Sequence, residues 1–125
     1  MKKIPTDNIR AKSLFKTSYQ AVEAAKDIQV KEEKANSILR ELYEGIHQYC
    51  EAIGYLKGYK FQSHEEITIF LRDILKEPII ADKFDRYRKL RNGINYYGES
   101  VSLETIKEAL QEIPILIKKL EKYTN

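Results

Sequence analysis

Apolar residues recur at three- and four-residue intervals along long stretches of this chain, and this spacing restricts its fold more than any other feature. The clearest example runs through Leu39, Leu42, Ile46, Tyr49, Ile53 and Leu56. Such a spacing places apolar side chains on one face of an α-helix. Only five glycines and three prolines interrupt the 125 residues, and no alternating pattern of useful length predicts a strand. The sequence therefore predicts an all-α protein.

The same pattern and its end signals predict five helices. They span about residues 7–28, 32–56, 64–75 and 80–97, and a last one follows the N-cap Ser102. Ser63 and Glu66 form a capping box, Glu77-Pro78 ends the third helix, and Gly98 is a left-handed C-cap. The residues available for burial in the first, third and last helices are Ile9, Leu14, Tyr19, Val22 and Ala25; Ile67, Phe70, Leu71 and Ile74; and Ile106, Leu110, Ile113, Ile117 and Leu120.

Three small or rigid residues inside these helices carry further predictions. Gly45 and Gly54 each cost about 1 kcal/mol relative to alanine, so we expect close packing of a neighbouring helix at both. Pro114 is expected to kink the last helix or to split it in two. Because the connections are short, the expected architecture is an up-and-down bundle of four long helices plus one short helix, forming a single domain over residues 1–125.

Composition excludes several classes of protein. No stretch approaches the roughly 18 apolar residues of a membrane span, and the N-terminal segment has no apolar region of a secretory signal, so we expect no membrane association and a cytoplasmic location. Cys50 is the only cysteine, which excludes an intramolecular disulfide and a cysteine-based zinc site. No paired ligand spacing indicates a metal, and no phosphate-binding loop indicates a cofactor.

The net charge of +3 is too small to indicate nucleic acid, but its distribution is uneven. Lys83, Arg86, Arg88, Lys89 and Arg91 lie within nine residues and are offset only by Asp85. A solvated helix face is the simpler interpretation of such a run.

Residues 89–98, KLRNGINYYG, combine arginine, two asparagines and two tyrosines near a helix end. At about 100° per residue, Tyr87, Leu90, Ile94 and Tyr97 share an arc that is expected to face the core. The next arc carries Arg88, Arg91, Asn92 and Asn95, with Tyr96 just beyond. Arginine binds phosphate through two parallel hydrogen bonds, amides donate and accept, and tyrosines stack on unpaired bases. These residues predict either a phosphate site or, alternatively, arginines paired with carboxylates of a neighbouring helix.

A second pair of residues has the same two interpretations. Arg40 and Tyr43 share a helix face and either line the same cleft as Arg91, or Arg40 pairs with Glu44 while Tyr43 packs in the core. His47 and Glu51 are expected to form an i,i+4 surface pair, and His64 is expected at the start of a helix as a surface or capping residue.

The Arg-Asn pair, followed four to six residues later by a conspicuous polar or aromatic residue, resembles the signature of the HEPN family (higher eukaryotes and prokaryotes nucleotide-binding). The segment RELYEGIHQYCEAIGYLKGYKFQSHEEI is similar to the second helix and the start of the third helix of that family, and the likeness covers about residues 34–122. It implies a homodimeric bundle of four or five helices. Many members are metal-independent ribonucleases in which an arginine and a histidine act on the RNA phosphate and ribose.

Carried over to this sequence, the resemblance makes Arg91, Asn92 and Tyr96 the catalytic positions, because the histidine position falls on Tyr96, Tyr97 or Gly98. A tyrosine with an ordinary pKa near 10 is a poor general base at neutral pH, so we predict ribonuclease activity that is absent or feeble. Other members are partners of a minimal nucleotidyltransferase in systems of toxin–antitoxin type; the tyrosine they modify corresponds to Gly98, one or two residues from Tyr96 and Tyr97.

The sequence thus predicts a cytoplasmic, homodimeric protein that binds a nucleotide or single-stranded RNA and has a nucleotidyltransferase as a protein partner. Its predicted ligand-binding residues are Arg40, Tyr43, Arg88, Arg91, Asn95 and Tyr97. The alternative is a catalytically inert helical module that docks on another protein.

Overall fold

The computed structural model describes residues 1–125, and helices account for most of them. The elements in chain order are β1 (Lys2–Lys3), α1 (Asn8–Asp27), the 3₁₀ turn η1 (Glu32–Lys34), α2 (Ala35–Lys57), β2 (Tyr59–Lys60), α3 (His64–Ile69), the π-helical turn η2 (Phe70–Ile74), α4 (Pro78–Tyr97), α5 (Leu103–Leu120) and the 3₁₀ turn η3 (Glu121–Tyr123). The all-α prediction is confirmed. The one addition is a small antiparallel ribbon that pairs Lys2 with Lys60 and Lys3 with Tyr59.

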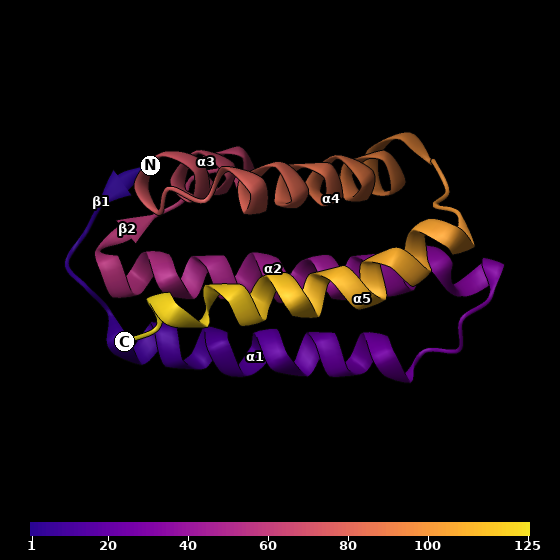
Figure 1. Ribbon diagram of the computed structural model, residues 1–125, viewed down its shortest axis with the longest axis horizontal. Coiled ribbons are helices and arrows are strands. Elements are labelled where there is room, and N and C mark those ends of the chain that lie inside the picture. The colour runs from indigo at the N-terminus through magenta and orange to yellow at the C-terminus, as the bar shows by residue number, and fades with distance from the viewer.

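The long helices lie side by side along the long axis of the molecule (Figure 1). In that view α1 forms one outer layer, α2 and α5 lie in the middle, and α3 and α4 form the opposite outer layer. None of the helices combines the length and the apolar character that a membrane span requires.

The centre of the fold is α2, which contributes residues to the core on several sides. The predicted stripe is confirmed from Leu39 to Ile53, whereas Leu56 is only partly buried. Large side chains of α2 itself and of the elements around it fill the core. The largest fully buried ones are Tyr43, Tyr49, Tyr87, Phe70 and Phe84.

A close approach of α1 to α2 explains Gly45. A Cβ atom at this position would lie 2.5 Å from Cγ2 of Val22 and 3.2 Å from the carbonyl oxygen of Ser18. The buried Ser18 hydroxyl donates a hydrogen bond of 2.6 Å to the carbonyl oxygen of Gly45. The prediction of a neighbouring helix is confirmed here but is wrong for Gly54, because the side chain that faces it is Phe61, in the segment after β2.

The predicted burial in α1 is wrong at two residues, since 84% of Ile9 and 46% of Tyr19 are exposed. The buried residues of this helix are instead Ala11, Ser18, Ala21, Val22 and Ala25. Small side chains let α1 lie close against α2, and this contact decides which face is buried.

The third helix differs from the prediction in its second half. The amide of Leu75 donates to the carbonyl oxygen of Phe70 at 3.0 Å, a five-residue step that defines a π turn. The wider turn rotates the following residues, so Ile74 is 37% exposed and Leu75 is buried in its place. The prediction that Ile74 is buried is therefore wrong.

The last two helices follow the prediction at their ends. Pro78 occupies the first turn of α4, where a missing amide hydrogen costs little, and Gly98 ends the helix with φ of 65°. The prediction that Tyr97 faces the core is wrong, because its side chain is 76% exposed. After Gly98 the chain folds back, and Glu99 packs on Gly93, which lies one helical turn before Tyr97 on the same face of α4. Glu99 therefore occupies the space next to the core on this face. Helix α5 begins after the Ser102 cap and continues through Pro114, so it is not split.

Candidate ligand-binding site around Arg91

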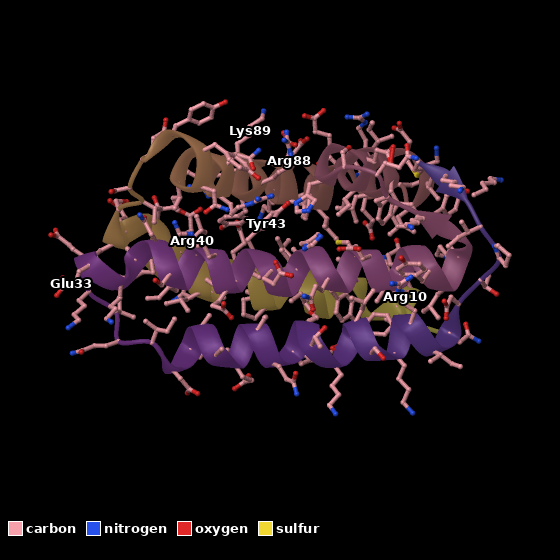
Figure 2. The ribbon with its side chains drawn as sticks, turned by 180° about the vertical axis from the view of Figure 1, so that it is seen from behind. Arg10, Glu33, Arg40, Tyr43, Arg88 and Lys89 are labelled. Atoms are coloured by element: carbon pink, nitrogen blue, oxygen red, sulfur yellow. The ribbon has the colours of Figure 1, made fainter.

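Three helices bring the candidate residues together. Helix α2 lies against α4 so that the Arg40 Nε donates to Oδ1 of Asn95 at 2.8 Å. Helix α3 packs along α4 in the reverse direction, with the Thr68 hydroxyl 3.1 Å from Asp85. In Figure 2, Arg40 and Tyr43 lie between α2 and the α3–α4 layer, and Arg88 lies within that layer. Residues from α2, the start of α3 and the second half of α4 therefore meet in one region.

Arg91 is at the centre of this region and has no carboxylate partner. Its guanidinium carbon lies 4.9 Å from the centre of the Tyr43 ring and 6.0 Å from that of Tyr96. Its Nη2 donates a hydrogen bond of 2.8 Å to Nδ1 of His64. Its Nε is buried and makes no hydrogen bond. A guanidinium that is bonded only to neutral groups keeps its full charge available for an anion.

His64 was not predicted to be part of the site. The interpretation of this residue as only a surface or capping residue is wrong, because its ring reaches Arg91 from the start of α3. Arginine donates hydrogen bonds and accepts none, so Nδ1 of His64 must be the unprotonated nitrogen. The Tyr43 hydroxyl, 2.8 Å from the same nitrogen, is then also a donor. Burial and the nearby charges of His47 and Arg91 lower the pKa of His64 to about 4.

His47 stacks on His64 with a distance of 4.0 Å between ring centres. Its Nε2 pairs with Glu51 as predicted, and Nδ1 lies 3.7 Å from Glu44. The pair is not on the surface, since the His47 side chain is only 12% exposed. Burial lowers the pKa of His47, but the carboxylates of Glu44 and Glu51 outweigh it and raise this pKa to about 9. A charged imidazole therefore lies against a neutral one.

Two clefts adjoin Arg91, and both have Arg91 and His64 in their walls. One lies between α2 and α4, has a volume of about 330 Å³, and is named here the Arg40 cleft; its other residues are Arg40, Glu41, Tyr43, Glu44 and Asn95. The second lies between α3 and α4, has a volume of about 270 Å³, and is named the Tyr96 cleft; its other residues are Ser63, Glu65, Arg88, Asn92 and Tyr96.

The two predicted arginines of α4 therefore have different surroundings. Arg88 forms an ion pair of 2.8 Å with Asp85 on its own helix and lies 3.7 Å from Glu65 of α3. The Glu65 contact matches the predicted pairing with a carboxylate of a neighbouring helix, whereas the closer partner, Asp85, is on α4 itself. The Arg88 side chain also lines the Tyr96 cleft. Arg91 has no such partner.

The remaining predicted residues also separate. Arg40 pairs with Asn95, and neither an ion pair nor a hydrogen bond joins it to Glu44, so the predicted Arg40–Glu44 pair is wrong. Tyr43 packs in the core, as the alternative predicted, and with Arg40 it also lines the same cleft as Arg91. Asn92 and Tyr96 line the Tyr96 cleft. Tyr97 lines neither of the two clefts.

A larger hollow of about 670 Å³ lies elsewhere on α3 and α4, and its charges are balanced. Its residues are Thr68, Arg72, Asp82, Asp85, Arg86, Lys89, Leu90 and Glu99. Arg86 pairs with Glu108, and Lys89 lies 3.1 Å from Asp85. We place the candidate site at Arg91 because only there is a partly buried cation without an anionic partner.

The site offers a fixed guanidinium, a neutral imidazole and an exposed tyrosine ring within one small region. These groups suit the binding of an anion that carries an aromatic part. No group of three His, Cys, Asp or Glu side chains is arranged to hold a metal ion. Comparison with known protein families and with curated proteins finds no match for this sequence.

Proposed function

We propose that this protein binds nucleotides or single-stranded RNA, with a phosphate held by Arg91. The observation that carries the proposal is the guanidinium without a carboxylate partner, at the junction of the Arg40 and Tyr96 clefts. The buried Nε, which has no hydrogen bond in the free protein, would gain an acceptor if the guanidinium turned toward a phosphate oxygen. Arginine forms two parallel hydrogen bonds with phosphate, so the site suits this anion better than it suits a single-point acceptor.

The resemblance described above supports a wider setting for the same site. The proposal includes a HEPN-like up-and-down bundle, a cytoplasmic homodimer, and a nucleotidyltransferase as the protein partner. A two-fold dimer would bring two Arg91 sites to one shared surface. The 68% exposed Tyr96, beside Arg91, is accessible for such an assembly or for a ligand.

One observation favours a second candidate function, the metal-independent cleavage of RNA. His64 holds an unprotonated nitrogen 2.8 Å from the Arg91 guanidinium. When Arg91 turns to a phosphate and the Tyr43 hydroxyl also releases Nδ1, this nitrogen can accept the proton of the ribose 2′-hydroxyl. The 2′-oxygen then attacks the phosphorus to form a 2′,3′-cyclic phosphate, and the expelled 5′-oxygen of the next nucleotide takes a proton from water. In the free protein the pKa of His64 is about 4, so Nδ1 is unprotonated at neutral pH, as a general base must be.

Binding to a short single-stranded RNA tests the main proposal. Arg91→Ala is expected to weaken binding to every RNA sequence and to flatten the salt dependence of affinity by about 0.7 in the slope of log K against log salt. Arg91→Lys is expected to weaken binding as well, because a point charge cannot replace the planar fork. Arg86→Ala is the matched control, since Arg86 is on the same helix, pairs with Glu108 and lines neither cleft at Arg91.

One result would contradict phosphate binding by Arg91. Unchanged RNA affinity in Arg91→Ala, together with a lower melting temperature, would make Arg91 a structural residue and would favour the inert interaction module. Cleavage is tested in the same samples without added metal. Activity that depends on Arg91 and His64 and survives Tyr96→Phe would support the second candidate, whereas activity that appears only in Tyr96→His would exclude His64 as the base.

A further inference from the structure

The two clefts that meet at Arg91 are built from different elements and carry different chemical groups. The Arg40 cleft is walled by α2 and α4, and the Tyr96 cleft by the start of α3 and α4. Arg91 and His64 are the only residues common to both. A phosphate on Arg91 therefore has space for a substituent on each of two sides, as a phosphodiester requires and a terminal phosphate does not.

We infer that the site takes a phosphodiester joining two nucleotides, with the phosphate on Arg91 and one nucleoside in each cleft. The inference rests on the proposed function and specifies its ligand as a dinucleotide unit of a single strand rather than a free mononucleotide.

The Tyr96 cleft has the groups for a stacked base. The Tyr96 ring is 68% exposed, and its centre lies 6.0 Å from the Arg91 guanidinium carbon, so a base lying on the ring stays within reach of the bound phosphate. The Asn92 amide in the same wall both donates and accepts hydrogen bonds. Stacking on an aromatic ring tolerates any base. This cleft is expected to bind a base without strong preference.

The Arg40 cleft has carboxylates that are expected to discriminate between bases. Glu41 makes no ion pair or hydrogen bond within the protein, and it lies in the same wall as Glu44. The imidazolium of His47, 3.7 Å away, lowers the pKa of Glu44 to about 2, so this carboxylate is ionised at neutral pH. Carboxylates repel a second phosphate and accept hydrogen bonds from an exocyclic amino group, as on cytosine. A base that carries an amino group is therefore expected in this cleft in preference to uracil.

The decisive comparison uses two ligands whose charge and size rank them in opposite orders. A mononucleotide carries a charge of about −1.5 to −2, whereas a dinucleoside monophosphate carries only one negative charge. Probes with 2′-O-methyl groups prevent cleavage. If charge alone governs binding, the mononucleotide binds more tightly. If both clefts are occupied, the dinucleoside monophosphate binds more tightly by about fivefold or more, the gain from one additional base contact.

Two variants with matched controls locate the bases. Tyr96→Ala is expected to remove the advantage of the dinucleoside monophosphate, while Tyr97→Ala, an adjacent exposed tyrosine outside both clefts, retains it. Glu41→Gln is expected to reduce the preference for cytidine-containing over uridine-only probes. Glu32→Gln, an exposed acidic residue ahead of α2, is expected to leave that preference unchanged. Affinities are measured by NMR titration of the wild type and each variant.

The outcomes separate the inference from the proposed function. A mononucleotide that binds as tightly as the dinucleoside monophosphate, with both weakened in Arg91→Ala, overturns the two-nucleotide site and leaves phosphate binding in place. Binding of neither ligand, or binding that Arg91→Ala does not change, overturns the proposed function itself. Equal losses in Tyr96→Ala and Tyr97→Ala would show that the Tyr96 cleft holds no base.

Discussion

Phosphate binding at Arg91 is predicted to take up a proton at His64. In the free protein burial and the charges of His47 and Arg91 lower the pKa of His64 to about 4, and its Nδ1 accepts a hydrogen bond from Arg91. A bound phosphate draws the guanidinium away and places a negative charge beside the ring. Both changes stabilise the imidazolium, so the pKa of His64 is expected to rise on binding.

The size of this change follows from Coulomb's law. A unit negative charge about 4 Å from the imidazolium contributes about 4 kcal/mol at an effective dielectric constant of about 20. Solvent reaches part of His64 and reduces this value, so we expect a pKa of about 5.5 to 7 in the complex. Between pH 7.5 and pH 5 the affinity should then increase by about four- to 70-fold, with about 0.5 to 0.9 proton taken up per ligand at pH 5.5.

Other charged and titratable groups face His64 from each element packed against it. His47 of α2, with a pKa of about 9, remains charged, and Glu44, with a pKa of about 2, remains ionised. Burial raises the pKa of Tyr43, which stays neutral. Glu51 of α2 pairs with His47, and Glu65 and Arg88 line the Tyr96 cleft, so a variant of His64 is needed to assign the proton.

Calorimetry in buffers of different ionisation enthalpy measures the proton uptake directly. The ligand is a uridine oligonucleotide, because neither its bases nor its phosphodiesters titrate in this range. His64→Gln is the control, since a glutamine amide oxygen can still accept the hydrogen bond from Arg91 but cannot take up a proton. Proton uptake that persists in His64→Gln, or an absence of uptake in the wild type, would refute the assignment.

Three further predictions concern stability and assembly. The raised pKa of His47 contributes stability that is present below about pH 6.5 and is lost as the pH rises through about 9. The lowered pKa of His64 acts in the opposite direction: its contribution to stability is present above about pH 6.5 and is lost as the pH falls through about 4. Urea denaturation should therefore show the largest contribution of the pair near pH 6.5, and a flat profile would contradict this. Gly45→Ala should cost about 1–3 kcal/mol by overpacking against Val22, and Val22→Ala in the same chain should recover part of it; an increase in stability would refute the close contact. Analytical sedimentation at micromolar concentration should show a homodimer, and a species of only 14.7 kDa would exclude the shared Arg91 surface.

The helices could be predicted from the sequence, but the buried face of α1 could not. In α2 the large apolar residues and the core coincide, because this helix is surrounded by neighbours. In α1 the contact is made by Ser18 and Val22 against Gly45, so small residues decide the orientation and Ile9 is left exposed. Hydrophobic periodicity predicts the buried face of a helix from its large apolar side chains. This prediction fails where the close approach of two backbones determines the packing.

The π turn at the end of the third helix also could not be predicted, because a prediction from the sequence assumes a constant α-helical period. An α-helical period places Ile67, Phe70, Leu71 and Ile74 on one face, and the first three are buried as expected. One wider turn, closed by the bond from Leu75 to Phe70, moves the next apolar residue into the core instead. Both Ile74 and Leu75 are apolar, so the sequence permits either register and only the packing selects one.

The site was predicted on α4, and what the sequence did not reveal was the residue from α3. A search for a histidine four to six residues after Arg91 finds only Tyr96, Tyr97 and Gly98. The imidazole beside Arg91 comes from 27 residues earlier in the chain. Ser63 caps α3 and fixes His64 in its first turn, and the reversed packing of α3 on α4 then directs this ring toward Arg91. Because a contact between antiparallel helices leaves no fixed spacing in the sequence, the missing histidine of α4 says nothing about whether an imidazole is present at the site.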